Sequence, residues 1–210
     1  MLNDEKLLII GYSIISSFFV ARGGIEMKSM REIQLTPYNI AWEKEFSKEA
    51  ATLTTIMSAQ VLGVHHIGST AVPGLSAKPI IDLLIEVKDI KKVDTYNQRM
   101  EQLGYEAKGE NSIKGRRYFQ KGGNERTHHV HIYEKGHPEI NRHIWFRDYL
   151  RTHPDTAKEY ETLKIELAHR YRFEPEKYVE NKTNFIHKID GLALKWRKGS
   201  SNKNRKDDLR

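Results

Sequence analysis

One apolar stretch, residues 79–87 (PIIDLLIEV), constrains the fold of this chain more than any other feature. It is almost continuous in Ile, Leu and Val, which is typical of a strand at the centre of a sheet with both faces buried. Asp82 interrupts the run, and a carboxylate in such a place is costly to bury unless it is paired or bound to a cation. The stretch therefore predicts a central strand that carries one functional or well-paired acidic residue.

The segment before this strand predicts a phosphate site. Residues 61–67 are expected to form a strand that ends in Gly68, Ser69 and Thr70, and the loop that follows ends at Lys78. Glycine lets a ligand approach the backbone closely, and hydroxyl groups beside free amides can cradle a phosphate. With the acidic strand, the turn points to a phosphate site with a divalent metal. The alternative is an ordinary loop whose neighbouring carboxylate is satisfied by backbone amides.

Two histidines, His129 and His131, alternate along another predicted strand, residues 128–133, and so share one of its faces. A His-x-His pair can supply two metal ligands or two donors to a phosphate, although hydrogen-bonded histidines on a polar face are the commoner case. If this strand and residues 79–87 belong to one sheet, Asp82 and the two histidines converge. We therefore predict a metal site formed by these three side chains.

Other charged residues are weaker candidates. Arg116 and Arg117 lie on a strand predicted before the histidine strand, and alternation lets only one of them face the site. We assign the phosphate-binding role to Arg117, because a guanidinium group binds phosphate oxygens well. Arg147 and Asp148 are expected to form a structural ion pair. Lys182 is a lone cation, and it is less well placed than the lysine of the glycine loop.

Composition and charge limit the partners. The chain has 210 residues, no cysteine and a net charge of +7, which rules out disulfides and thiolate metal sites and agrees with a cytoplasmic location. Residues 195–210 hold seven Lys and Arg against two Asp, a charge of +5, and residues 1–29 are balanced, which leaves +2 for the body. Because the excess charge belongs to the tail, composition argues against nucleic acid as the main partner and leaves the oligomeric state open.

The first 29 residues are ambiguous. Residues 7–21 (LLIIGYSIISSFFVA) are apolar, but the run is shorter than the roughly 20 residues that span a bilayer. It also resembles the core of a signal peptide, although the preceding MLNDEK is not clearly basic. We favour a third interpretation, in which residues 1–29 are an upstream extension and the natural start is Met27 or Met30. A membrane is a partner only if this leader is retained.

Hydrophobic periodicity predicts an α+β fold: a mixed sheet with flanking helices and a helical C-terminal half. Residues 195–210 lack apolar anchors and are expected to form a basic, disordered tail. The strands are predicted at residues 61–67, 79–87, 105–107, 116–120 and 128–133, and the helices at residues 40–60, 89–103, 139–151, 152–171 and 175–196.

Five segments together resemble the GrpB family, a group of small bacterial proteins assigned to the nucleotidyltransferase superfamily. The resemblance covers about residues 30–192 and implies that residues 30–194 form one domain with a polymerase-β-like core. The matching segments are MREIQLTPYNIAWEKEF from Met30, HIGSTAVPGLSAKPIIDLLIEV, HHVHIYE, FRDYLRTHPDTAKEYETLK and YVENKTNFI.

The resemblance also implies roles for individual residues. In the superfamily a Gly-Ser turn holds nucleotide phosphates, and paired carboxylates bind magnesium ions that support phosphoryl transfer. The turn residues match, and Asp82 matches the first carboxylate, but Leu84 stands at the second carboxylate position. His131 or His129 would then replace the missing carboxylate, as a base or as a ligand of Mg²⁺, with Mn²⁺ or Zn²⁺ as alternatives. Asp82 and His131 are accordingly the predicted catalytic residues.

Three functional hypotheses follow. The first is an enzyme that transfers a nucleotidyl group from a nucleotide to an unknown acceptor, and the second is an inactive nucleotide- or metal-binding accessory module, which Leu84 favours. GrpB-like domains also occur fused to dephospho-coenzyme A kinase, which implies a nucleotide-linked role. The third, an RNA-binding protein, rests on the basic tail alone and ranks lowest. The predicted phosphate-binding residues are Gly68, Ser69, Thr70, Lys78 and Arg117.

Overall fold

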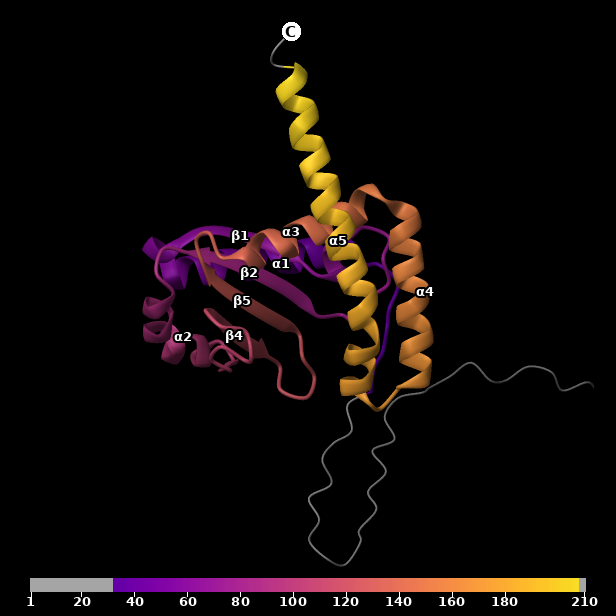
Figure 1. Ribbon diagram of the computed structural model, residues 1–210. Helices are drawn as coiled ribbons and strands as arrows, with labels where there is room; N and C mark the ends of the chain where they lie inside the picture. The colour runs from indigo at the N-terminus through magenta and orange to yellow at the C-terminus, as the bar shows by residue number, and fades with distance from the viewer. Residues whose placement is uncertain (1–31, 208–210) are drawn as a thin grey trace, which may run out of the picture.

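The computed structural model describes residues 32–207, with side chains through residue 199. One mixed sheet is flanked by helices, and two long C-terminal helices stand beside one end of the sheet (Figure 1). This arrangement confirms the α+β fold with a helical C-terminal half. The predicted leader, residues 1–29, lies outside the described residues.

The sheet has the order β1-β2-β5-β4-β3, with β2 and β5 parallel and the other neighbours antiparallel. The apolar strand β2 therefore has a partner on each side, as its composition predicted. Strand β1 is antiparallel to β2, and β2 is parallel to β5. The C-terminal end of β1 therefore lies at the same end of the sheet as the N-terminal ends of β2 and β5. The strands are β1 (Val61–Ile67), β2 (Ile81–Val87), β3 (Tyr105–Ala107), β4 (Arg116–Lys121) and β5 (His128–Glu134).

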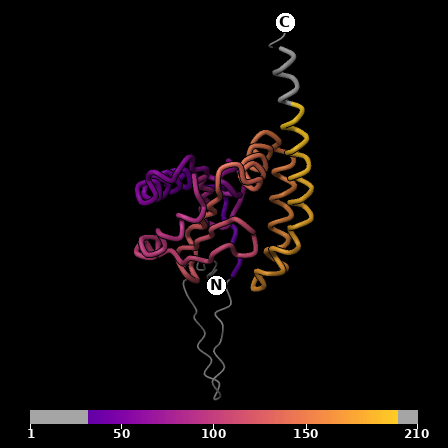
Figure 2. The backbone as a smooth tube through the Cα atoms, turned by 60° about the vertical axis from the view of Figure 1, so that its left-hand side comes forward, coloured from indigo at the N-terminus to yellow at the C-terminus, as the bar shows by residue number. Residues whose placement is uncertain are grey.

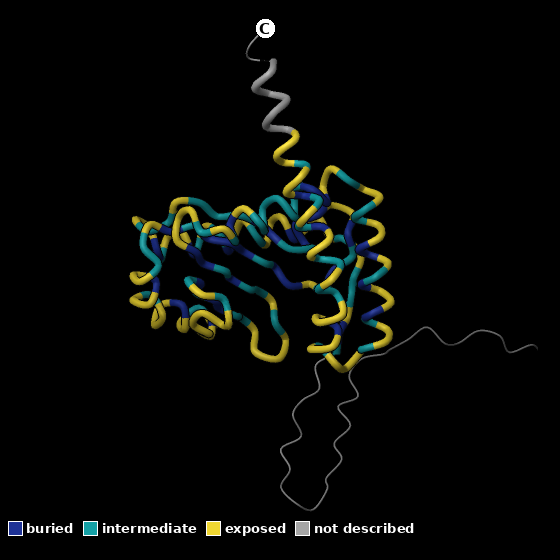
Figure 3. The backbone as a smooth tube through the Cα atoms, in the orientation of Figure 1, coloured by how far each residue is buried: buried dark blue, intermediate teal, exposed yellow. Residues whose placement is uncertain are grey.

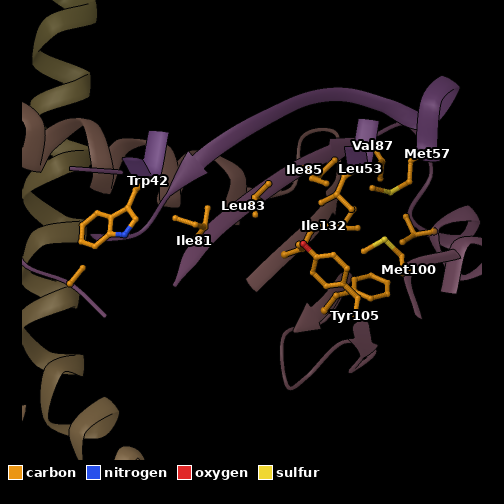
Figure 4. Close-up of a cluster of buried hydrophobic side chains, with 14 residues drawn as sticks. Trp42, Leu53, Met57, Ile81, Leu83, Ile85, Val87, Met100, Tyr105 and Ile132 are labelled. Carbon is orange, nitrogen blue, oxygen red and sulfur yellow. The ribbon is translucent and has the colours of Figure 1, made fainter. Parts of the chain in front are cut away.

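One face of the sheet carries the main hydrophobic core. Helix α1 (Ala41–Met57) and the short helix α2 (Asn97–Gln102) cover this face. Figure 4 shows Leu53 and Met57 of α1 and Met100 of α2 against alternate residues of β2, such as Leu83 and Ile85. The period-two alternation of β2 therefore sends its odd-numbered residues into this core and turns Asp82 and Leu84 toward the other face.

The segment after β2 differs from the single helix that the sequence predicted. It forms a 3-10 helix, Ile90–Tyr96, before α2, although Asp89 caps it through the amide of Lys91 as expected. Thr95 donates its hydroxyl hydrogen to the carbonyl of Lys92. Such side-chain bonds and β-branched residues weaken α-helical preference, which accounts for the tighter turns.

Three helices form the C-terminal half, and each begins with a proline, which is well suited to the first helical turn. The helices are α3 (Pro138–Thr152), α4 (Pro154–Arg170) and α5 (Pro175–Asp207). Figure 2 shows α4 and α5 side by side, and Figure 3 shows the buried residues on the sides where these helices pack.

Helix α5 is longer than the sequence predicted. It continues to Asp207, whereas residues 195–210 were expected to be disordered. The ring of Trp196, the last residue of the predicted helix, lies against the rings of Tyr149 and His153, so these contacts anchor the predicted part of α5. No helix within residues 32–207 is long and apolar enough to cross a membrane.

Candidate functional site

The turn after β1 brings its backbone against Asp82. Gly68 has φ +71, which L-residues with a side chain rarely adopt, and a Cβ atom there would lie 2.4 Å from Asp82 Oδ2. Glycine is therefore required both for the turn and for the close approach of the carboxylate. The predicted neighbours Ser69 and Thr70 follow in one 3-10 turn, Ser69–Ala71.

Hydrogen bonds hold this turn in place. His66 Nε2 lies 3.0 Å from the hydroxyl of Thr70, which donates to the carbonyl of Ile80. Helix α3 adds Arg147, which donates to the carbonyl of His66 at 2.9 Å and also forms the predicted ion pair with Asp148. Burial lowers the pKa of His66 to about 4, so this histidine is neutral at physiological pH and acts as a structural partner of the turn.

Asp82 pairs with His129 on the neighbouring strand. The parallel register of β2 and β5 sets these residues opposite each other, and His129 Nδ1 lies 3.0 Å from Asp82 Oδ1. Burial raises the pKa of Asp82, but the hydrogen bond from His129 and the electrostatic influence of His129, His131 and Lys78 outweigh this effect and hold the pKa below its usual range. The predicted convergence of the two strands is confirmed, and Asp82 is ionised.

His131, two residues after His129 on β5, lies farther from Asp82 than His129 does. Its Nε2 is 4.0 Å from Asp82 Oδ1, and its Nδ1 is 3.4 Å from the guanidinium of Arg116. Burial, with smaller contributions from the neighbouring His143 and Arg116, lowers the pKa of His131 to about 3. His131 is therefore a neutral and weak base, and it is not among the residues that line the cavity described below.

The side chains predicted to hold a metal are not arranged as a metal site. Within residues 32–207, no group of three or more His, Asp or Glu side chains could hold an ion. His129 uses one ring nitrogen on Asp82, and its Nε2 is buried without a hydrogen-bond partner among the described residues. Leu84, at the second carboxylate position, is 0% exposed and packs against Ile67 and Tyr133. The residues present therefore do not fit a two-metal centre.

The turn and Asp82 open instead onto a cavity of about 230 Å³. Helices α4 and α5 form its opposite wall, where each contributes one tyrosine and one lysine. The polar lining residues are Gly68, Ser69, Thr70, Lys78, Asp82, His129, Tyr160, Lys164, Tyr178 and Lys182. Six of the residues predicted from the sequence to bind a nucleotide or a metal thus line the cavity: Gly68, Ser69, Thr70, Lys78, Asp82 and His129.

Lys164 is the most buried cation of this cavity. Its side chain is 2% exposed, and its Nζ donates to Ser69 Oγ at 3.2 Å and to the carbonyl of Ser76. Burial, together with the charges of Lys182 and Lys78, lowers its pKa to about 7, against the opposing effect of Glu161. Glu161, one turn earlier, accepts a hydrogen bond from the amide of Ser76, so α4 clamps both ends of the glycine loop.

The second helical lysine, Lys182, lies over the ring of Tyr178 at 4.4 Å, and Lys78 lies 5.5 Å from the same ring. Burial and the charge of Lys78 lower the pKa of Lys182 to about 8, against the opposing effect of Asp82. Among the described residues, no carboxylate lies within ion-pair distance of Lys182 or Lys164. Aromatic faces stabilise these cations where carboxylates would otherwise be expected.

Arg117 does not reach the cavity. It points to the opposite face of the sheet, where its guanidinium binds both carboxylate oxygens of Asp94 at 2.6 and 2.8 Å. Arg116, the alternate residue, shares the face of His131 and stacks on Tyr118 at 4.8 Å. The register between β4 and β5 decides this choice, and it favours the arginine that the sequence analysis did not select.

Sequence reasoning named Lys182 only as a weaker candidate and missed the rest of the helical wall of the cavity, Tyr160, Lys164 and Tyr178. A signal was present, because the same Tyr-x-x-x-Lys spacing occurs as YETLK in α4 and as YVENK in α5. Residues four apart lie on one side of a helix, so each motif presents a ring and an ammonium group together. The repetition in two adjacent helices was the clue to a shared site.

Comparisons with known proteins cover most of the chain. The family model described as GrpB protein matches residues 32–191. YqkA, a UPF0157 protein of Bacillus subtilis (strain 168), is 47% identical over 174 residues, which are 83% of this chain and 51% of that protein. The chain thus spans about half the length of this relative.

A solved structure and a distant relative add to this picture. The crystal structure of conserved protein GrpB from Enterococcus faecalis is similar with a TM-score of 0.76 and 47% identity, and the match covers 78% of this chain and 99% of that one. A protein named dephospho-CoA kinase from Mycolicibacterium paratuberculosis is 25% identical over 189 residues, which are 78% of this chain and 46% of that protein.

Proposed function

The chain belongs to the GrpB family, and from that premise we propose that its cavity binds the phosphate groups of a nucleotide or another phosphorylated small molecule. The family's assignment to the nucleotidyltransferase superfamily supports this proposal. The distant relative named dephospho-CoA kinase supports a nucleotide-linked role in the same way.

The observation that carries the proposal is the excess of positive charge around the cavity, where Lys164 is buried and Lys78 and Lys182 are partly buried. Lys78, Lys164 and Lys182 line a cavity with a single carboxylate, Asp82. Buried cations are costly unless they are paired, and the lowered pKa values of Lys164 and Lys182 show that cost. An anion bound in the cavity would offset the free-energy cost of keeping Lys164 and Lys182 charged. A phosphate group fits, since it can also accept hydrogen bonds from Ser69 and from the turn.

Nucleotidyl transfer to an unknown acceptor is the proposed reaction class. In this reaction the lysines would neutralise charge on the phosphates and the turn would orient them, which are the two contributions that phosphoryl transfer needs most from a protein. His131 is a poor candidate for the base, because Arg116 and burial keep it neutral and weakly basic. The buried Leu84 favours the second candidate function, an accessory module that binds a nucleotide without turnover.

Calorimetric titration of the full chain tests the binding proposal. ATP, GTP, CTP and UTP are titrated in EDTA and, in separate series, with Mg²⁺, Mn²⁺ or Zn²⁺, which also tests the predicted divalent metal. We expect at least one nucleotide to bind and the Lys182→Met variant to bind at least tenfold more weakly. Lys195→Met is the matched control, because Lys195 is exposed on the same helix. If no nucleotide binds under any of these conditions, the proposal is wrong.

A bound nucleotide then permits a test of turnover. Incubation with each bound nucleoside triphosphate in a cell extract, which supplies possible acceptors, separates the two candidate functions: nucleotidyl transfer to an acceptor hydroxyl releases pyrophosphate in excess of the extract without the protein, and an accessory module does not. Self-modification of the chain, measured by mass spectrometry, would identify a protein acceptor. The cytoplasmic location that we propose agrees with a nucleotide ligand and with the absence of cysteine.

A further inference from the structure

We infer that this cavity binds a doubly charged phosphate monoester group without a divalent metal, with Lys78, Lys164 and Lys182 in place of the ion. The inference rests on the proposed phosphate-binding function and goes further, since it names the charge state of the ligand and removes the predicted cofactor from the binding step. Three observations support it.

The first is the charge balance of the cavity. Three lysines and one carboxylate line it, which is a formal charge of +2 when all are ionised. A phosphate monoester carries about −1.5 to −2 at pH 7, whereas a phosphate diester carries about −1. The cavity is therefore neutralised by a monoester and only half neutralised by a diester.

The second is that the environment disfavours a divalent cation. Leu84 and its apolar neighbours fill the position of the second carboxylate, and the guanidinium of Arg116 lies beside His131. Among the residues that the structure describes, Asp82 is the single carboxylate of the lining, and it faces Lys182 and Lys78, whose charges repel a cation. A Mg²⁺ site usually needs one or two carboxylates free of such competition.

The third is how the lysines surround the space. They come from three elements: the loop before β2, helix α4 and helix α5. Lys164 is held by Ser69 and Ser76, and Lys182 lies over Tyr178, so the ammonium groups are positioned before a ligand arrives. The cavity is smaller than the about 300–1,000 Å³ of pockets that enclose whole drug-sized ligands, so it takes the phosphate end of a molecule.

Titrations in EDTA test the inference with three probes. Inorganic phosphate, AMP and 3′,5′-cyclic AMP are each titrated into the full chain, because the last two share base and sugar but differ in phosphate charge. We expect inorganic phosphate and AMP to bind in EDTA, and cyclic AMP to bind at least tenfold more weakly than AMP. Equal affinity for AMP and cyclic AMP would contradict the predicted charge selection.

Asp82 distinguishes the two modes of binding. If a metal bridged Asp82 to the phosphate, Asp82→Asn would weaken binding. In the metal-free mode the same variant removes a repulsive charge, so AMP should bind as tightly or several-fold more tightly. Lys182→Met should weaken AMP binding at least tenfold, Lys182→Arg should retain most of it, and Lys195→Met should leave it unchanged. Circular dichroism of each variant confirms that it is folded.

The outcomes separate this inference from the proposed function. If phosphate compounds bind only when Mg²⁺, Mn²⁺ or Zn²⁺ is added, the metal-free inference is refuted and the phosphate-binding function stands. If no phosphate compound binds with or without metal, both are refuted. Binding in EDTA that is insensitive to Lys182→Met would place the ligand elsewhere and refute the assignment of this cavity.

Discussion

The affinity of the cavity for a phosphate monoester should fall steeply between pH 7 and pH 9. The pKa of Lys164 is about 7 and that of Lys182 about 8, both lowered by burial and by neighbouring lysines. A bound dianion favours the charged lysines, so each lysine that is neutral in the free protein must take up a proton when the ligand binds. Affinity is therefore highest where both lysines are already protonated and declines as pH rises.

The magnitude follows from the two pKa values. From pH 7 to pH 9 the protonated fraction of Lys164 falls from about one half to about one hundredth, which weakens binding about 50-fold. For Lys182 the fraction falls from about nine tenths to about one tenth, which contributes about tenfold. The two effects multiply to a largest expected loss of affinity of about 500-fold between pH 7 and pH 9, or about 4 kcal/mol of binding free energy. The ligand adds no opposing trend, since the second phosphate pKa is about 6.

Other groups near Lys164 do not titrate in this range. Glu161 stays ionised, because hydrogen bonds from Lys158 and Ser76 lower its pKa to about 2. Burial raises the pKa of Tyr160 well above its usual value, so that phenol stays neutral. The decline in affinity can therefore be attributed to the lysines.

The assay is calorimetric titration of AMP in EDTA at pH 7, 8 and 9, in buffers with different ionisation enthalpies that reveal proton uptake. Wild-type protein should take up about half a proton or slightly more at pH 7. Lys164→Met should bind more weakly at pH 7 and retain only about a tenfold decline to pH 9. Lys195→Met should behave as wild type. An affinity that is constant from pH 7 to pH 9 would refute the reasoning.

Three further predictions concern single residues. Gly68→Ala should destabilise the protein by about 1–3 kcal/mol in thermal or urea denaturation and abolish AMP binding, because Gly68 has φ +71 and ψ −169, a conformation that only glycine adopts readily, and lies against the Asp82 carboxylate. Leu84→Asp, which restores the second carboxylate of the superfamily pattern, should destabilise the protein by about 3–5 kcal/mol in urea denaturation, since the position is fully buried among apolar side chains. Arg117→Ala should leave AMP binding unchanged and cost less than about 1 kcal/mol, because its partner is a partly exposed carboxylate on the other face; a loss of binding would restore its predicted role.

The sequence by itself determined the strands and the faces of their side chains. Strand periodicity placed Asp82 and Leu84 on one face of a central strand, and His129 and His131 on one face of another. The structure confirms both strands and their pairing. These features are local, since side-chain alternation and apolar runs depend on a few consecutive residues.

The identity of the arginine near the site was decided by register. Alternation allowed either Arg116 or Arg117 to face Asp82, and only the pairing of β4 with β5 separates them. A shift of one residue would have exchanged their faces. The packing of α5 was also decided by tertiary structure, because Trp196 finds its aromatic partners, Tyr149 and His153, on and just after another helix.

The cavity itself was decided by tertiary structure. Lys78, Lys164 and Lys182 are separated by many residues in the sequence. The glycine loop singled out Lys78, whereas Lys164 and Lys182 each resemble an ordinary surface lysine. The three lysines share one site because α4 and α5 pack beside the end of the sheet at which β1 ends and β2 and β5 begin. Burial at that end of the sheet lowers the pKa of two of the lysines, and burial is a property of packing that no local pattern specifies.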